Sequence, residues 1–258
     1  MNSLETEHRK DHQIALVTGA GSGIGRASSL ALLANGWSLV LVGRRKDALE
    51  ETASLSGKAS SRAVPIPTDI GQPNQVTTLF NAVKERFGRL DFLLNNAGDN
   101  VPSMPFEDVA YADWQRVVQT NITGTFLCTQ NAFRLMKTQK PMGGRIVNIG
   151  APSAYIPRPD GTTYTVTKHA VAGLTKAISL DGRKYNIACS QIDPGNVEPP
   201  GKQTQHAAKQ ANGTLEVEPT MDIKNVTDTL LLIANMPLTA NIQSVFVMPT
   251  NMPFIGRG

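Results

Sequence analysis

Two side chains in the middle of the chain are spaced for acid–base chemistry. Tyr164 and Lys168 stand four residues apart, and on a helix this spacing places both on the same face. A free tyrosine has a pKa near ~10, and an ammonium group within a few ångströms lowers it. The pair therefore predicts a phenol that exchanges a proton near neutral pH.

A glycine-rich turn stands near the start of the chain, in the run Thr-Gly-Ala-Gly-Ser-Gly-Ile-Gly at 18–25. It follows a short apolar run and opens an amphipathic stretch, as expected of a strand, a turn and a helix. Glycines here let the backbone approach a pyrophosphate, and the helix N-terminus supplies free N–H groups. The pattern predicts a dinucleotide site, since a merely flexible loop does not need four glycines at alternate positions. The predicted contacts are Gly19, Gly21, Ser22, Gly23, Ile24 and Gly25.

The second strand-like run ends in Gly43, Arg44 and Arg45. In NAD-preferring sites of this kind, an acidic side chain at this place binds the ribose 2′-hydroxyl. A guanidinium instead binds a 2′-phosphate through two parallel hydrogen bonds. We therefore predict NADP(H) as the cofactor, with Arg44 as the main contact and Arg45 as the second. Two arginines on a solvated surface are the alternative.

Two further segments follow later strand-like runs. Asp69 is expected to bind the adenine amino group and Ile70 to cover the adenine ring. The Asn-Asn-Ala-Gly turn at 95–98 suits a backbone shaped around the cofactor. The contacts predicted in this turn are Asn96, Ala97 and Gly98.

The candidate site residues are far apart in the sequence, so strands and helices have to bring them to one edge of a sheet. Short apolar runs alternate with helix-length amphipathic stretches, which is the pattern of βαβ units and a parallel sheet. Strands are predicted at 14–18, 38–42, 63–67, 92–95, 145–149, 187–192 and 244–248. Helices are predicted at 23–35, 45–54, 73–87, 111–136, 161–185 and 223–234. The predicted fold class is α/β, a Rossmann-type doubly wound parallel sheet of seven strands with helices on both faces, which binds ligands at the carboxyl ends of its strands.

The composition limits the class of protein. A chain of 258 residues suits a single domain at 13–258 behind a flexible tail at 1–12. Basic residues are dispersed and no apolar run has membrane length, so nucleic-acid and membrane partners are not expected. The tail lacks the apolar core of a signal peptide, which predicts a cytoplasmic protein. Cys128 and Cys189 have no metal-ligand spacing and no other cluster has it, so buried free thiols and no metal are expected.

Together, the motifs resemble the short-chain dehydrogenase/reductase family over nearly the whole chain. The resemblance rests on the glycine turn, the Asn-Asn-Ala-Gly turn, the tyrosine–lysine pair, a Pro-Gly turn and Asn121, in the family's order and spacing. It implies that Tyr164 is the general acid/base, that Lys168 assists it and binds the nicotinamide ribose, and that Asn121 holds a relay water. The further cofactor contacts implied by the resemblance are Tyr164, Lys168, Pro194, Gly195 and Val197.

The activity implied by this resemblance is NADP(H)-dependent hydride transfer on a small-molecule carbonyl/secondary alcohol pair. The same resemblance implies that the helices around Asn121 and Tyr164 form dimer and tetramer interfaces, so a homo-oligomer such as a homotetramer is expected. Packing of the small residues of these helices against the sheet is the alternative.

One position departs from the family's pattern at the centre of the site. The family's serine, which polarises the substrate carbonyl, aligns with Ala151, thirteen residues before the tyrosine. Loss of one hydrogen-bond donor to a developing oxyanion is typically worth ~2.7–4 kcal/mol. Three accounts follow: Ser153 replaces the missing hydroxyl, Tyr164 works without it, or the fold has lost redox activity and serves as an isomerase, a cyclase or a cofactor-binding protein. An engineered serine-to-alanine change is a fourth account.

Two more regions are expected near the substrate. A long irregular region at about 194–219 predicts a lid, with a short helix at 207–211. Tyr155 and Arg158, between a strand and a helix, are expected to border the substrate pocket. Within the lid region, Pro199 stands where the family often has a threonine that bonds the nicotinamide carboxamide.

Overall fold

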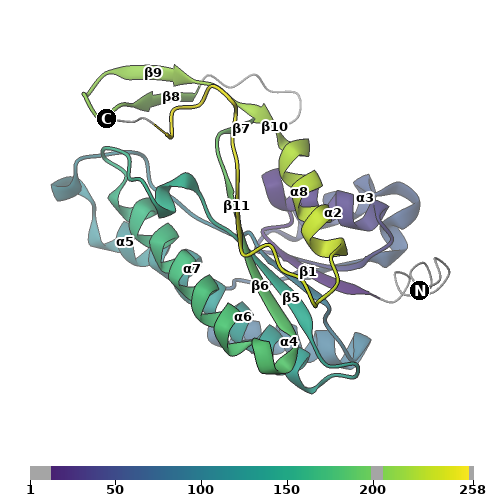
Figure 1. Ribbon diagram of the computed structural model, residues 1–258. Coiled ribbons are helices and arrows are strands. Elements are labelled where there is room, and N and C mark those ends of the chain that lie inside the picture. Colours follow the sequence, from purple (N-terminus) through teal and green to yellow (C-terminus); the bar gives the residue numbers. More distant parts are fainter. Residues whose placement is uncertain (1–12, 199–205, 256–258) are drawn as a thin grey trace.

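The computed structural model describes residues 13–198 and 206–255, so the predicted tail at 1–12 and Pro199 lie outside the described residues. Seven parallel strands form one sheet in the order β11-β6-β5-β4-β1-β2-β3 (Figure 1). The strands are β1 (Ile14–Thr18), β2 (Ser38–Gly43), β3 (Ala63–Pro67), β4 (Phe92–Asn95), β5 (Gly144–Ile149), β6 (Ile187–Pro194) and β11 (Ser244–Val247). This order confirms the predicted doubly wound fold, because the strand sequence reverses on either side of β1.

Helices cover both faces of the sheet (Figure 1). One face carries α2 (Gly23–Ala34), α3 (Lys46–Leu55) and α8 (Ile223–Asn235), and the other carries α4 (Pro73–Phe87), α5 (Tyr111–Val118), α6 (Thr125–Thr138) and α7 (Thr162–Asp181). Short 3-10 turns are η1 (Gly57–Arg62), η2 (Phe106–Asp108), η4 (Pro152–Ala154) and η5 (Arg183–Tyr185). None of the helices in the described part of the chain is both long enough and apolar enough to pass through a bilayer.

The two faces of the sheet bury separate hydrophobic clusters. Along β1, Ala15 and Val17 belong to the cluster under α2 and α8, whereas Ile14 and Leu16 belong to the cluster under α4 and α6. This division follows from the period of two residues in a strand. Because both faces are covered, β1 is apolar from Ile14 to Val17, as is usual in a parallel sheet between helices.

The helix predicted at 111–136 is wrong in one respect, because it is interrupted. A π-helical segment, η3 (Gln119–Gly124), separates α5 from α6. A π turn is a short interruption inside an α-helix, frequently at a functional site, and a helix-length amphipathic stretch alone does not distinguish it from continuous α-helix. The interruption falls at Asn121, the residue assigned to the site.

The predicted lid region forms strands instead of the expected helix at 207–211. Beyond the carboxyl end of β6, β7 (Val197–Glu198) pairs with β10 (Met221–Asp222), and β8 (His206–Lys209) pairs with β9 (Leu215–Glu218). Gly213 has a φ of +90° in the turn, and the Gln210 N–H donates to the Thr214 carbonyl at 2.8 Å. An Asn-Gly pair favours such a hairpin turn over a helix, which explains the error.

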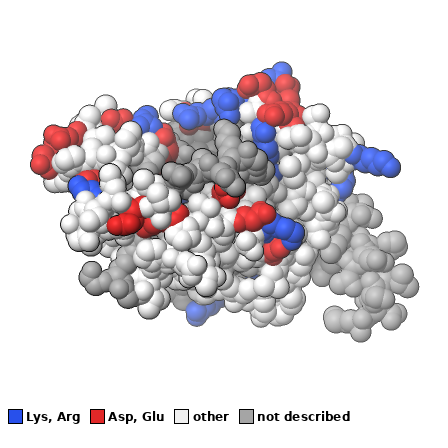
Figure 2. Space-filling model, turned by 90° about the horizontal axis from the view of Figure 1, so that it is seen from above, with Lys and Arg blue, Asp and Glu red and all other residues white. Residues whose placement is uncertain are grey.

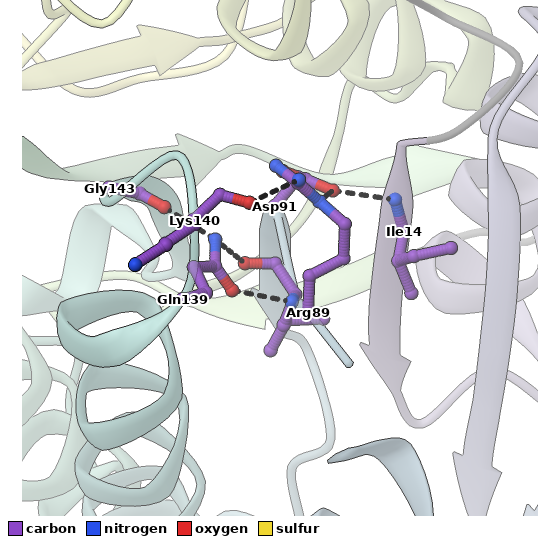
Figure 3. A network of polar contacts seen from close by, with 7 residues as sticks. Ile14, Arg89, Asp91, Gln139, Lys140 and Gly143 are labelled. Atoms are coloured by element: carbon purple, nitrogen blue, oxygen red, sulfur yellow. Dashed lines mark hydrogen bonds and ion pairs between the residues drawn. The ribbon is translucent and has the colours of Figure 1, made fainter. Parts of the chain in front are cut away.

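The amino ends of the strands are closed by a polar network (Figure 3). The Arg89 guanidinium pairs with the Asp91 carboxylate, which also accepts the Ile14 N–H at 2.9 Å. The buried Gln139 amide bonds to both the N–H and the carbonyl of Leu90, at 2.8 and 3.0 Å. These side chains join the starts of β1 and β4 to the end of α6.

Candidate active site

A cavity of about 620 Å³ opens at the carboxyl ends of β1, β2 and β4. Most of the predicted cofactor contacts lie on its wall, together with the proposed catalytic pair. The predicted residues on the wall are Gly19, Gly21, Ser22, Ile24, Arg44, Arg45, Asp69, Ile70, Asn96, Ala97, Gly98, Asn121, Tyr164 and Lys168.

The two remaining glycines of the turn, Gly23 and Gly25, shape it instead of lining the cavity. A Cβ on Gly25 would lie 2.2 Å from the Gly19 carbonyl oxygen and 2.4 Å from the Asn96 amide nitrogen, so only glycine permits this close packing. Gly19 itself has a φ of +68°, which favours glycine. Above Gly23 the space is open, so the N-terminus of α2 is accessible to an anion.

Arg44 and Arg45 lie where β2 ends, and both are exposed. Neither guanidinium has a hydrogen bond or ion pair within the described part of the chain. Arg26 offers a contrast, because its Nε donates to Thr52 and its Nη2 bonds to the Gly21 carbonyl and Glu51. Arg26 therefore supports the glycine turn, whereas the other two arginines present unused donors to the cavity.

A second cavity of about 570 Å³ adjoins the first, and Tyr164 lies on the walls of both. The predicted residues Ser153, Pro194 and Gly195 line this second cavity, as does Ala151. Val197 lies in β7 and is outside both walls.

The tyrosine and the lysine have the predicted mutual position on α7. Lys168 is buried, and its ammonium donates to the Ile149 carbonyl at 2.8 Å. The Nζ atom lies 5.3 Å from the centroid of the Tyr164 ring. Among the described residues, the phenol hydroxyl has no hydrogen-bond partner, so it is available to a molecule in either cavity.

Asn121 is held in the π turn by its own side chain. Its Oδ1 accepts the Asp99 N–H at 2.7 Å, and its Nδ2 donates to the Asp99 carbonyl at 2.9 Å and to the Thr167 hydroxyl at 3.2 Å. The amide thus fastens the π turn to the segment after β4 and to α7. Since both Nδ2 hydrogens are engaged, a relay water at this residue has to donate to the second lone pair of Oδ1 or bind the backbone of Asn121.

Ala151 and Ser153 stand at the start of the turn after β5. Ala151 is buried and precedes η4, in which Ser153 is the middle residue. Within residues 13–198 and 206–255, the Ser153 hydroxyl has no hydrogen-bond partner, although it lies on the wall beside Tyr164. The structure therefore provides an unused hydroxyl two residues along the chain from the position where the family's serine is missing.

Asp193 is a feature of the site that the sequence analysis missed. Its carboxylate is fully buried behind Ala151, accepts from the Gln191 amide at 2.7 Å and also accepts the Ala151 N–H. Burial raises the pKa of the carboxyl, and these hydrogen bonds together with Lys168 only partly oppose the rise. An acidic residue at the end of an apolar strand, directly before the Pro-Gly turn, was the signal that could have revealed it.

Of the two residues expected to border the substrate pocket, only Arg158 lies on the wall of the second cavity. The prediction for Tyr155 is wrong: its ring packs on Phe246 of β11 at 4.8 Å, and its hydroxyl lies 3.2 Å from the Ser244 hydroxyl. Met252, from the segment after β11, reaches the cavity wall without any sequence signal.

Charges around these cavities are of both signs. Figure 2 shows basic and acidic side chains interspersed over this face of the described molecule. In the ranges 13–198 and 206–255, no three His, Cys, Asp or Glu side chains gather as a metal site would require. The two cysteines are buried and free, and burial raises their pKa values to about 12.

Comparison with known proteins identifies relatives of this fold. The family model for short chain dehydrogenase matches residues 13–210. A 3beta-hydroxysteroid dehydrogenase of Mediterraneibacter gnavus is 34% identical over 192 residues, which are 74% of this chain and 68% of the relative.

Solved structures agree with this family match. A 3-ketoacyl-(acyl-carrier-protein) reductase from Brucella melitensis, solved with NADH, superimposes with a TM-score of 0.80 at 25% identity, covering 92% of this chain and 97% of the other. A variant of the actinorhodin polyketide ketoreductase, solved with NADPH, has a TM-score of 0.79 at 26% identity, covering 93% and 97%. The two structures hold different nicotinamide cofactors, so the choice of cofactor has to be argued from this chain's own residues.

Proposed function

The chain belongs to the short-chain dehydrogenase family, and we propose that it is an NADP(H)-dependent oxidoreductase acting on a carbonyl/secondary alcohol pair. The observation that carries the proposal is the position of Tyr164, whose side chain lies on the walls of both cavities. A phenol at this boundary can touch a nicotinamide from one side and a carbonyl oxygen from the other. The first cavity then holds the cofactor, and the second holds the substrate.

The residues of the first cavity fit a phosphorylated dinucleotide. The turn at Gly19 and Gly21 and the open N-terminus of α2 would hold the pyrophosphate. Arg44 would bind a 2′-phosphate and Arg45 would assist, which supports NADP(H) over NAD(H) because the wall offers unused guanidinium donors at the exit of β2. Lys168 would bind the nicotinamide ribose. The remaining contacts in this proposal are Asp69 and Ile70 at the adenine, Ser22, Ile24, Asn96, Ala97 and Gly98 along the cofactor, and Pro194, Gly195 and Val197 near the carboxamide.

When bound, the nicotinamide supplies or accepts the hydride. In reduction, the carbonyl carbon of the substrate takes the hydride while its oxygen takes the proton of the Tyr164 hydroxyl. The buried ammonium of Lys168, anchored at the Ile149 carbonyl, stabilises the negative charge that then remains on the phenol oxygen. Asn121 positions the π turn beside this pair and supports the return of a proton from solvent.

Ser153 is the proposed donor to the carbonyl oxygen in place of the missing serine. Its hydroxyl is on the substrate wall and, in the part of the chain that the structure describes, is not engaged elsewhere. A donor at a developing oxyanion contributes ~2.7–4 kcal/mol to transition-state stabilisation. In this proposal, Tyr164 donates a proton to the substrate oxygen and Ser153 donates a hydrogen bond to it. Lys168 acts indirectly, by stabilising the charge on the Tyr164 oxygen.

A second candidate function follows from Ala151. If no hydroxyl reaches the carbonyl oxygen, the fold can bind NADP(H) and serve in isomerisation, cyclisation or sensing without net redox turnover. The two functions separate in one experiment, which follows NADPH absorbance with a panel of ketones and measures NADPH binding by calorimetry.

We expect turnover with at least one ketone, and a loss of kcat of about 10²- to 10⁴-fold in Tyr164→Phe, as is typical when a general acid is removed. The variant should retain NADPH binding. Binding without turnover across the panel would instead support the second function. Turnover that survives Tyr164→Phe would contradict the assigned role of this tyrosine.

We also propose a homo-oligomer and a cytoplasmic location. An apolar groove of about 600 Å³ lies between α6 and α7 and includes Phe126, Phe133 and Leu180. Phe126 and Leu180 are 45% and 59% exposed, which suits burial against a second copy of the chain. Light scattering coupled to gel filtration tests the oligomer, and a monomeric mass would contradict it.

A further inference from the structure

Arg158 is a cavity residue with no role in the hydride or proton transfer described above. It lies six residues before Tyr164, between η4 and α7, and lines the same cavity as Tyr164 and Ser153. Its side chain is 25% exposed, so the guanidinium is neither a surface group nor a fully buried one.

The guanidinium is held from behind by a buried carboxylate. Glu218, at the end of β9, has a side chain only 1% exposed and forms an ion pair with Arg158. The carboxylate also accepts from Asn196 Nδ2 at 3.0 Å and from Gln210 Nε2 at 3.1 Å. Burial opposes ionisation of this group, but the hydrogen bonds from Arg158, Asn196 and Gln210 outweigh it, so the pKa of Glu218 lies below its ordinary value.

This arrangement orients a donor set toward the cavity. A guanidinium carries five N–H donors in a planar fork, and the single bond recorded for Arg158 uses one nitrogen, Nη2, on Glu218. Within the described residues, the remaining donors of Arg158 have no acceptor. Because Arg158 lines the cavity and the 1% exposed Glu218 is not among its wall residues, a molecule in the cavity meets the guanidinium and not the carboxylate.

The other charges of the cavity wall cancel each other. Lys209 of β8 pairs with Asp160 at 2.7 Å, which forms a local neutral pair. Apart from Tyr164, the described wall has no aromatic ring, and its larger apolar side chains are Leu215 and Met252. Such a lining suits a small polar ligand better than a large apolar ring system.

We infer that Arg158 is a specificity-determining residue that binds the carboxylate of a keto acid substrate, whose ketone carbonyl lies at Tyr164. The inference rests on the proposed function and deepens it. In the reduction, the ketone carbon takes the hydride, its oxygen takes the Tyr164 proton, and the product is the corresponding hydroxy acid with the carboxylate unchanged. Planar, bidentate recognition of a carboxylate is the task for which arginine is best suited.

The test compares matched substrate pairs. A panel of keto acids, with one to five bonds between ketone and carboxylate, is assayed with NADPH beside the methyl ester of each acid. We expect kcat/KM to favour the best acid over its ester by about 10- to 100-fold, the range of one or two hydrogen bonds to a charged group. Arg158→Gln should remove this preference by lowering kcat/KM for the acid about 10- to 100-fold more than for the ester. Arg158→Lys should keep part of it.

Two controls separate specificity from structure. Arg86→Gln removes an exposed arginine of α4 far from the cavity and should leave the acid-to-ester ratio unchanged. Glu218→Gln weakens the support of Arg158 but keeps the guanidinium, so it should keep a preference for the acid. An equal loss on acid and ester in Arg158→Gln, or a wild-type protein that prefers the ester, would overturn the inference.

A binding measurement keeps this inference distinct from the proposed function. Calorimetry with the hydroxy acids, in the presence of NADP(H), measures carboxylate binding without turnover. Turnover of esters without a preference for acids would overturn the role of Arg158 and leave the oxidoreductase proposal standing. Hydroxy-acid binding that Arg158→Gln abolishes, in a protein that turns over neither acid nor ester, would support the carboxylate site and overturn the redox function.

Discussion

The two ends of the central sheet use polar side chains in opposite ways. At the amino ends, Gln139 bonds to backbone groups and Arg89 bonds to Asp91 (Figure 3). Arg145 is buried there, with its guanidinium bonded to Asn241 and to carbonyls after α8. At the carboxyl ends, the hydroxyls of Tyr164 and Ser153 have no partner among the described residues.

This difference separates groups that hold the fold from groups that await a ligand. A buried polar group that is bonded within the chain costs stability when its partner is removed. A polar group that faces a cavity without a partner contributes little to stability, so its removal should affect binding or catalysis alone. Variants at the amino ends should therefore lower the free energy of unfolding and leave catalysis unchanged, whereas variants at the carboxyl ends should do the reverse.

After Tyr164→Phe, the largest effect is expected for Ser153→Ala, also at the carboxyl end. If Ser153 is the donor to the substrate oxygen, its removal lowers kcat by about 10²- to 10³-fold. The free energy of unfolding should change by no more than ~0.5 kcal/mol, because the hydroxyl has no partner in the described protein. Steady-state kinetics and urea unfolding measure the two quantities.

Ala151→Ser provides the matched variant for this prediction. Placed in the Ser153→Ala background, it should restore activity by returning a hydroxyl to the family's position. Full activity in Ser153→Ala alone would show that Tyr164 works without a second donor. A large gain from Ala151→Ser in the otherwise unchanged chain would show that Ser153 is a poor replacement.

The second effect is expected at the amino end, for Gln139→Leu. The Gln139 amide bonds to the Leu90 N–H, the Leu90 carbonyl and the Gly143 carbonyl, and leucine satisfies none of them. We expect a loss of ~2–4 kcal/mol in the free energy of unfolding. At a temperature well below the melting transition, kcat/KM should be unchanged. Gln115→Leu, on the exposed side of α5, is the control and should be neutral.

A third variant, Arg44→Ala, tests the cofactor assignment. Hydrogen bonds to a charged group are worth ~1.5–3 kcal/mol, so KM for NADPH should rise about 10- to 100-fold. KM for NADH should stay the same, because NADH lacks the 2′-phosphate. Arg45→Ala should have a smaller effect in the same direction. A similar rise for both cofactors would show that Arg44 does not recognise the 2′-phosphate.

The sequence predicts the carboxyl end of β1, β2 and β4 well because its determinants are local. The turn requires glycine at Gly19 because of its positive φ, and at Gly25 because a Cβ would collide with the Gly19 carbonyl oxygen. Both requirements come from the backbone of the turn itself. The strand pattern is reliable for a similar reason, since both faces of β1 are covered and its first four residues are all apolar.

The substrate side is less predictable because it is assembled from distant segments. Tyr155 is not among the residues of the cavity wall, because its ring packs on Phe246 of β11, a contact that no local pattern records. Met252 reaches the wall only through the path of the chain after β11. The π turn at Asn121 lies inside a helix-length amphipathic stretch, and that pattern does not distinguish a π turn from continuous α-helix, so its geometry appears only in three dimensions.

The smallest effect is expected for Asp193→Asn. Asp193 lies at the carboxyl ends of the strands, but it is buried and hydrogen-bonded within the chain, as the polar groups at the amino ends are. Since burial raises its pKa above the ordinary value of 3.8, the folded protein keeps the proton to a higher pH than the unfolded chain does. Folding therefore takes up a proton between these two pKa values, and the free energy of unfolding falls as the pH rises through this window.

Above this pH window, the charged Asp193 carboxylate costs stability. Asparagine removes the charge while keeping an acceptor for Gln191 and Ala151. We expect Asp193→Asn to be more stable than the parent at pH 7 by on the order of 1 kcal/mol, or about 2–4 °C in Tm, and to lose this advantage below the ordinary pKa. Thermal unfolding across this pH range measures the difference. A variant that is less stable than the parent at pH 7 would show that the ionised carboxylate is a net stabilising member of the buried network.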